Sequence, residues 1–483
     1  MSKVGTRDGA LDRVRAYFEG GTFEAELSAR VAHRTESQKL PESMPHLHKY
    51  LEDEMRPAFE EMGFTIKSYD NPIAGQAPAI LATRIEDPSL PTVLGYGHGD
   101  VIHGLEDQWT KGNGPWVTAR DGDRLYGRGT ADNKAQHTIN MAAMRAVLEE
   151  RGVLGFNAKF LLEMGEEAGS KGLAELVKAN KEDFASDVFI GSDGPRVSPA
   201  RPTLSLGCRG AVNFDLVCDL RDGGHHSGNW GGLLANPGII LAHAIATIVG
   251  AKGELLVEGL KPPAMTSAVR EVLSDIEIES GENGPAIDTW WGEPGLTPPQ
   301  RVYASNVFNV LAYATGTAGR PVNAIPPQAI ANCQLRFVAG TDVENIVSIL
   351  QAHLDEAGFA NVKVTPPPAS NDGTFQATRT EPDHPWVVFA RESLQRSTNS
   401  KPAIIPSMGG SICNDIFTDI LGLPAIWIPH SYTSCSQHAP DEHVLMSICG
   451  SALDVMAGVY WDIGALDPST RASLPPYITA RTA

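Results

Sequence analysis

The apolar residues of the first 60 positions recur every three or four residues, as in LDRVRAYFEGGTFEAELSARV (residues 11–31). This spacing predicts helices, because a helix brings such positions onto one face. Short apolar runs then alternate with further helical patterns. The runs predict buried strands at 78–85, 92–101, 157–167, 187–194 and 424–430, and helices are predicted at 133–152 and 171–184. Strands that alternate with helices are typical of a layered α/β domain with a largely parallel sheet.

The middle of the chain has a different order of elements. It predicts a strand at 203–220, a helix at 236–250, strands at 306–316 and 329–340, a helix at 341–359 and a strand at 361–368. This β-α-β-β-α-β order is that of a ferredoxin-like domain. We therefore predict a discontinuous α/β domain, residues 1–205 and 372–483, with an α+β domain inserted at 206–371. Residues 251–305 fit neither pattern, and we interpret them as an addition to the inserted domain.

Length and charge limit the class of function. A chain of 483 residues is too long for one simple core. The formal net charge of −19 argues against nucleic acid or an anionic membrane as a partner. The start has no apolar signal segment, no apolar run is long enough to cross a membrane, and the six cysteines form no CxxC pair. These features favour a cytoplasmic protein with reduced thiols.

Histidines and carboxylates gather at the predicted strand ends. In open α/β sheets, ligands bind beyond the carboxyl ends of the strands. Nitrogen and oxygen donors suit zinc, or the harder manganese and cobalt ions, and the lack of thiolates argues against a structural zinc site. The residues are His98 and Asp100 in GHGD, Asp132 in GRGTADNKAQ, Glu166 and Glu167 in GEE, Asp193 in SDG, and His438 in SCSQHAPDEH.

The charge of these residues indicates more than one metal ion. Asp132, Glu167 and Asp193 carry three negative charges, which two divalent cations would offset. Two metals bridged by a carboxylate and a water are a known hydrolytic arrangement. Asp100 follows His98 by two residues and is placed to accept the second ring N–H, which would fix the tautomer of the ligand.

The motifs, taken in order, resemble the M20 family of metallopeptidases, and in particular its carnosinase-type dipeptidase branch. The resemblance implies a zinc-peptidase-like three-layer α/β catalytic domain with an inserted ferredoxin-like α+β lid and dimerisation domain. The segments that carry it are HGD (98–100), GRGTADNKAQ (127–136), EMGEEAGS (163–170), GSDG (191–194), HHSGNWGG (225–232), NAIPP (323–327), GGSI (409–412) and QHAPDE (437–442).

The resemblance also implies roles for the site residues. Glu166 would be the general base, which takes a proton from a metal-bridging water as that nucleophile attacks and passes it to the leaving amine. The peptide between Asp132 and Asn133 is cis in the family. The implied metal ligands are His98, Asp132 and Asp193 for one ion, and Asp132, Glu167 and His438 for the other.

Substrate contacts are implied as well. His226 would reach the substrate carbonyl from the partner subunit of a homodimer, as an oxyanion donor. Asn323 and Arg336 would bind the terminal carboxylate of the substrate, which Arg suits by its bidentate geometry. The substrate loop of the catalytic domain would be formed by Gly409, Gly410 and Ser411.

Two assignments have competitors in the sequence. His430 and His443 compete with His438 for the late metal ligand, and the QHAPDE motif favours His438. His225 competes with His226, and the HSG register favours His226. The loop SMGGSICND (407–415) also departs from the branch, where it begins with an Arg-Glu pair and contains a Pro. The recognition of the substrate's amine or side chain is therefore open.

We predict a hydrolase that uses two divalent ions to cleave the amide bond of dipeptides or related small peptides. Zinc is the predicted metal, and manganese and cobalt are the alternatives. Asp193 favours the dipeptidase branch, because other branches carry Glu there. The alternative is an N-acyl-amino-acid deacylase or a glutamate-carboxypeptidase-type hydrolase with the same site. A non-catalytic scaffold is disfavoured, because neither a ligand nor the base is missing.

Overall fold

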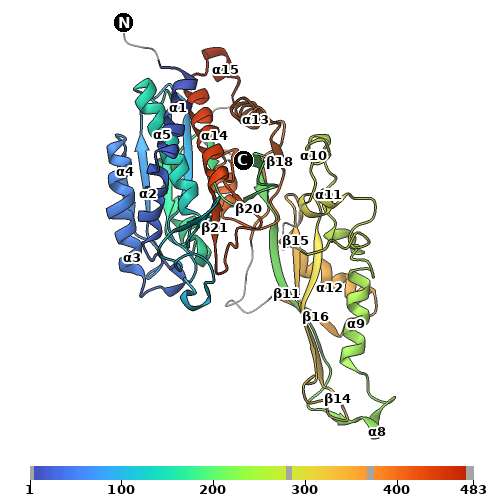
Figure 1. The fold of residues 1–483 in the computed structure, drawn as a ribbon. Helices are drawn as coiled ribbons and strands as arrows, with labels where there is room; N and C mark the ends of the chain where they lie inside the picture. Colours follow the sequence, from blue (N-terminus) through green and yellow to red (C-terminus); the bar gives the residue numbers. More distant parts are fainter. Residues whose placement is uncertain (1–4, 279–284, 367–374, 475–483) are drawn as a thin grey trace.

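The computed structural model describes residues 5–278, 285–366 and 375–474. Two sheets with separate hydrophobic cores organise these residues. Figure 1 shows them as two bodies, a broad one rich in helices and an elongated one beside it.

The larger body is built on a sheet of eight strands. Its centre, β6–β3–β7–β19, is parallel, as predicted. The outer strands are mixed, because β2 pairs antiparallel with both neighbours and β9 pairs antiparallel with β19 but parallel with β18. In sheet order the strands are β1 (Thr65–Tyr69), β2 (Ala79–Arg84), β6 (Asn157–Glu163), β3 (Thr92–His98), β7 (Val188–Gly191), β19 (Ala425–Trp427), β9 (Thr203–Ser205) and β18 (Ala403–Ile405).

Helices cover both faces of this sheet, because alternate strand residues point to opposite faces. Val93 of β3 belongs to one core and Leu94 to the other. The result is the predicted three-layer α/β arrangement. The first core takes in residues of α1 (Arg7–Glu19), α2 (Thr22–Val31), α3 (Met44–Lys49), α4 (Arg56–Glu61), α5 (Lys134–Arg151), α13 (Pro385–Thr398) and α14 (Met446–Gly464), and the second those of α6 (Leu173–Ala179) and α7 (Lys181–Phe184).

The second body has the predicted β-α-β-β-α-β order. Its strands are all antiparallel, and its two helices bury their apolar sides against one face of the sheet. The predicted single strand at 203–220 is wrong, because the chain passes there from one sheet to the other. The elements are β11 (Gly210–Asp219), α9 (Pro237–Ile248), β13 (Val307–Thr315), β15 (Gln328–Phe337), α12 (Ile346–Glu356) and β16 (Val362–Thr365).

The domain limits stay a prediction. The second limit, at 371/372, lies outside the described residues.

Shorter paired segments complete the described fold. These are β4 (Ala119–Asp121), β5 (Arg124–Tyr126) and β21 (His443–Leu445) in one sheet, and the pairs β8 (Pro195–Arg196) with β20 (Ser431–Tyr432), β10 (Gly207–Cys208) with β17 (Thr378–Arg379), and β12 (His225–His226) with β14 (Ala324–Ile325).

The segment 251–305 does not belong to the inserted body alone. It contains η5 (Glu258–Leu260), α10 (Ser267–Leu273) and α11 (Pro298–Tyr303). α10 packs against β18 at the edge of the large sheet. The segment therefore connects the two bodies.

All six cysteines are free thiols. None of the helices in the described ranges is both long enough and apolar enough to span a bilayer. The cytoplasmic location stays a prediction.

Candidate metal centre

The predicted metal ligands meet at one edge of the large sheet, where its central strands end. His98 is the last residue of β3, and Asp193 lies two residues beyond β7. Asp132 precedes α5, and Glu167 follows β6 in the 3-10 turn η4 (Glu166–Ala168). The predicted strand 157–167 is thus too long, since β6 ends at Glu163.

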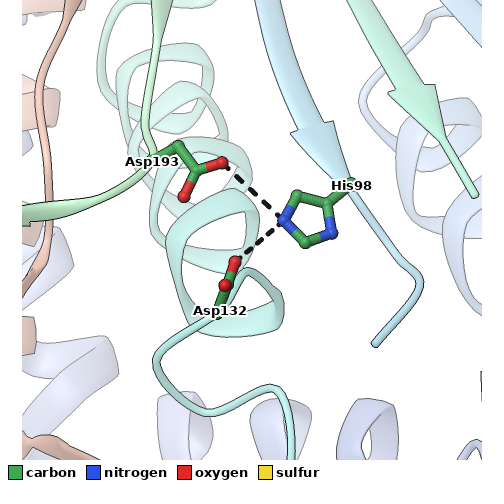
Figure 2. Close-up of side chains that lie close together, drawn as sticks. All are labelled: His98, Asp132 and Asp193. Atoms are coloured by element: carbon green, nitrogen blue, oxygen red, sulfur yellow. Dashed lines mark hydrogen bonds and ion pairs between the residues drawn. The ribbon is translucent and has the colours of Figure 1, made fainter. Parts of the chain in front are cut away.

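A first cluster consists of His98, Asp132 and Asp193, all buried. The Nε2 atom of His98 lies 2.9 Å from Oδ1 of Asp132 and 3.7 Å from Oδ2 of Asp193. Figure 2 shows both carboxylates turned toward the same ring nitrogen.

A second cluster shares Asp132 with the first. Nε2 of His438 lies 3.1 Å from Oδ2 of Asp132 and 3.0 Å from Oε2 of Glu167. Gln437 also donates a hydrogen bond to this Asp132 oxygen. Asp132 therefore offers one oxygen to each cluster, which is the geometry of a bridging ligand.

The electrostatics of the clusters favour a cation. Burial raises the pKa of Glu167 to about 7 and that of Asp193 to about 6, and Asp132 adds to both shifts. Hydrogen bonds to Asp132 and Glu167 raise the pKa of His438 to about 10. Without a cation the carboxylates repel one another and the histidine holds a proton. The donors are all nitrogen and oxygen, so the set fits divalent zinc, manganese or cobalt.

Asp100 contacts both His98 and the turn that carries Glu166 and Glu167. Nδ1 of His98 lies 3.1 Å from the carbonyl oxygen of Asp100 and 3.4 Å from its Oδ1. This contact leaves Nε2 free for a metal when Nδ1 carries the proton. The Asp100 carboxylate also accepts from the backbone N–H groups of Glu166, at 3.2 Å, and Glu167, at 3.0 Å. The sequence predicted that the Asp100 carboxylate would accept the ring N–H, whereas the nearer acceptor is the backbone carbonyl oxygen of Asp100. The contacts to Glu166 and Glu167 were not predicted.

Glu166 belongs to neither cluster but lines a cavity of about 560 Å³ together with Asp132 and Asp193. Burial raises the pKa of Glu166 well above its usual value, and the nearby carboxylates of Asp193 and Asp132 act in the same direction, against His98. A carboxylate with a raised pKa at the wall of a cavity is suited to proton transfer.

A model of peptidase family M20/M25/M40 matches residues 94–462. The chain belongs to this family. The M20 enzyme is 27% identical over 403 residues to Cysteinylglycine-S-conjugate dipeptidase of Corynebacterium striatum. The matched region covers 80% of this chain and 83% of that one. It is 32% identical over 349 residues to Cys-Gly metallodipeptidase dug1 of Schizosaccharomyces pombe, with 69% and 72% covered. The solved structure of the di-peptidase Dug1p from Saccharomyces cerevisiae matches with a TM-score of 0.71 and 20% identity, over 96% of this chain and 99% of that one.

Membership makes the protein a metal-dependent hydrolase, and the two clusters are its candidate metal ligands. The competing histidines lie elsewhere. His430 is buried with its Nε2 near Ser192 Oγ, and His443 contacts Tyr432. Neither belongs to a cluster within the described residues. The Asp132–Asn133 peptide is cis, as the resemblance implies.

Arg336 lies beside the loop that contains Gly409, Gly410 and Ser411, which lines the same cavity. Its Nη1 donates to Ser411 Oγ at 3.0 Å, and Ser411 Oγ donates to the carbonyl of Arg209 at 2.8 Å.

Arg209 is a second arginine at this loop, which the sequence reasoning missed. Burial lowers the pKa of Arg209, and the positive charge of Arg336 lowers it further. Neither guanidinium has an acidic partner among the described side chains. Two unpaired arginines side by side form a suitable site for a carboxylate.

His226 and Asn323 do not reach this metal centre within one chain. They lie in and beside the small pair β12–β14, at the tip of the elongated body far from β20 and β21 (Figure 1). Both are exposed, and the backbone N–H of Ser227 donates to the carbonyl of Asn323. β15 separates Asn323 from Arg336, and its eight steps from 328 to 336 alone span about 26 Å. The two residues that the resemblance implies for the terminal carboxylate therefore lie far apart in the single chain.

Glu442, a member of the QHAPDE motif without an assigned role, supports the bridging ligand. Its buried carboxylate accepts from Nη1 of buried Arg128 at 2.8 Å. It also accepts from the backbone N–H groups of Gly129 at 3.0 Å, Ala131 at 2.9 Å and Asp132 at 3.1 Å. One carboxylate thus fixes the loop that presents Asp132. Its position in the motif was the available signal.

We predict that Glu442→Gln destabilises the protein and weakens metal binding. The substitution leaves the buried charge of Arg128 without a counter-ion, which costs about 3 kcal/mol or more. The free energy of unfolding in urea and the metal content after dialysis measure the two effects. Glu52→Gln, which breaks an exposed pair with Arg56, is the control and should change stability by less than about 1 kcal/mol. Equal behaviour of the two variants would contradict the role of Glu442.

Proposed function

We propose that this M20 enzyme is a dinuclear metallodipeptidase that hydrolyses the amide bond of dipeptides or related small peptides. The observation that carries the proposal is Asp132, shared between two ligand clusters at the wall of one cavity. A cavity of about 560 Å³ is of the size that encloses a small ligand. The dipeptidase names of the two relatives in Corynebacterium striatum and Schizosaccharomyces pombe support the same class of substrate.

In this proposal His98, Asp132 and Asp193 hold one divalent ion, and Asp132, Glu167 and His438 hold the other. Zinc is the proposed metal, because it accepts this mixture of imidazole and carboxylate donors. When bound, such a pair of ions supplies an activated water and polarises the scissile carbonyl group.

Glu166 moves the proton. It takes a proton from the attacking water and delivers it to the amine nitrogen as the C–N bond breaks. Its raised pKa supports this role, because a group that both accepts and donates a proton works best when its pKa lies near the working pH. Asp100 keeps the turn that presents Glu166 in place through the backbone.

Arg336 and Arg209 are proposed to bind the terminal carboxylate of the substrate. Their guanidinium groups donate hydrogen bonds to Gly409 and Ser411, two residues in the wall of the cavity that Glu166 also lines. A dipeptide whose carboxylate meets these arginines would thus enter the cavity beside the metal clusters.

A homodimer is proposed because His226 and Asn323 are exposed at the far tip, away from the chain's own metal centre. From there they could serve a partner's site, where His226 would donate to the carbonyl oxygen. Nδ1 of His226 already accepts from the N–H of Gly228 at 3.1 Å, so Nε2 carries the proton of the neutral ring and is the donor.

The same body offers a surface for such a dimer. β13 is an edge strand with exposed residues along most of its length. Open strand edges and clustered exposed apolar side chains both mark sites of association. The exposed apolar residues of this body include Leu233, Ile239, Leu311, Tyr313 and Val322.

We predict that Glu166→Gln retains its metal ions and lowers kcat by about a thousandfold, because only the proton acceptor is lost. Steady-state assays on a dipeptide panel, with metal analysis of the same samples, measure both quantities. Glu175→Gln, on the exposed side of α6, is the control and should match the wild type. A kcat within tenfold of the wild type would rule out Glu166 as the base. Activity confined to N-acetyl or N-succinyl amino acids in the same panel would replace the dipeptidase function by the deacylase one.

We predict that chelation abolishes activity and that reloading with zinc restores it at about two ions per chain. Asp193→Asn should retain about one ion, because it removes a ligand from only one cluster, whereas Asp132→Asn should weaken both sites. Metal analysis after equilibrium dialysis gives the stoichiometry. Asp183→Asn, at the surface ion pair with Lys67, is the control. Two tightly held ions in Asp132→Asn would contradict the bridging role.

We predict that two inactive variants restore each other when they share a dimer. His226→Ala and Glu166→Gln homodimers should be inactive, whereas a heterodimer of the two has one site with both Glu166 and the partner's histidine intact. It should therefore show about half the wild-type activity, because the symmetric dimer has two equivalent sites. Differently tagged chains allow purification of the heterodimer. An inactive heterodimer would show that His226 does not act across the interface.

A further inference from the structure

Part of the cavity wall comes from the connecting segment 251–305, to which neither the sequence nor the family roles assign a function. Glu277, Ile278 and Tyr303 of this segment line the same cavity as Glu166 and the Gly409–Ser411 loop. The segment therefore faces any substrate that occupies the metal centre.

The backbone that carries Glu277 is anchored to the large sheet. Asp275 forms ion pairs with Arg201 at 2.9 Å and Lys401 at 2.6 Å. Ile276 is buried in a cluster that includes Ala403 of β18. With residue 275 tied to the catalytic body and residue 276 in its core, the position of Glu277 in the wall is fixed by that body.

The carboxylate of Glu277 is available to a ligand. Of the described residues that line the cavity, Glu277 is the single acid outside the metal clusters and Glu166. The part of the chain that the structure describes provides it with no ion pair and no side-chain hydrogen bond. The basic lining residue Arg196 is buried and occupied by the carbonyl of Pro429 and by Ser451 Oγ. Among the described residues, no cation therefore pairs with Glu277.

The charged groups at the cavity wall and next to it therefore have two signs. Arg209 and Arg336 provide positive charge beside the 409–411 loop, to which they donate hydrogen bonds, and Glu277 provides negative charge in the wall itself. The loop itself contributes Gly409, Gly410 and Ser411 to the wall, without a charged side chain. A ligand that carries a carboxylate and a second, positive group matches both parts of the wall.

We propose that Glu277 is a specificity-determining residue that binds a cationic group, an ammonium or guanidinium, on the side chain of the substrate. The inference rests on the proposed dipeptidase function and names its substrate class as dipeptides with a basic side chain. Ile278 and Tyr303 beside it provide apolar surface for the methylene stem of such a side chain.

The test uses matched dipeptides that differ only in the terminal ammonium: Lys-Gly against norleucine-Gly, and Gly-Lys against Gly-norleucine. The ratio of kcat/KM within each pair is measured on the zinc-loaded enzyme. Glu277→Gln should lower the ratio by about fivefold in one of the pairs, as expected for one partly exposed charge contact, and leave the neutral peptides unchanged. Glu277→Lys should lower it further, and added salt should weaken the wild-type preference.

Glu271→Gln, an exposed acid on α10 of the same segment, is the control and should keep the wild-type ratios. Unchanged ratios in both Glu277 variants would overturn the inference and leave the dipeptidase function standing. If the wild-type enzyme cleaves other dipeptides but none of these four, the inference alone is overturned; if it cleaves no dipeptide of the panel, the dipeptidase function is wrong and the inference falls with it.

Discussion

Repulsion among buried carboxylates is the constraint on which the rest of the structure depends. Glu167 and Asp193 follow strands of the large sheet, and Asp132 precedes α5. Asp132 contacts both His98 and His438, whereas Asp193 contacts His98 and Glu167 contacts His438. Burial alone pushes Glu167 and Asp193 toward the protonated form. The fold surrounds these carboxylates with groups that fix the backbone of the ligands and do not neutralise their charge. Asp100 fixes the turn of Glu167, and Glu442 fixes the loop of Asp132. Rigid backbone keeps the ligands at distances that suit metal binding.

Sequence patterns pointed to three residues of this candidate centre, His98, Glu167 and Asp193, because these follow strand ends. Once the strands at 92–101, 157–167 and 187–194 were recognised, a parallel arrangement alone was enough to bring His98, Glu167 and Asp193 to one edge. The element order of the second body followed equally from periodicity. The strand limits were less accurate, since Glu166 and Glu167 extend an apolar run in sequence while their N–H groups bond to Asp100 instead of a neighbouring strand.

Long-range placement was beyond the reach of the sequence. Asn323 and Arg336 are 13 positions apart in the numbering and suggest one subsite, yet β15 carries them to opposite ends of the second body. Arg209 and Glu277 lie in segments without a motif, and only the packing of their neighbours brings Arg209 to the 409–411 loop and Glu277 to the cavity wall. For Glu442 the motif was visible, but its hydrogen bonds to the 129–132 loop depend on contacts more than 300 positions away.

In the proposed dimer, the length of β15 sets the distance between two functional regions of the chain. One end of β15 places Arg336 against Ser411, which lines the chain's own cavity, and the other leads back to Asn323 and the β12–β14 tip that would serve the partner. Because each strand residue adds about 3.3 Å, its length sets how far apart two reaction centres must lie. A change of strand length would shift a group in one subunit against a substrate in the other, even though no residue at either centre had changed. The geometry of each reaction centre would then depend on β15, a strand whose residues lie mostly outside both centres.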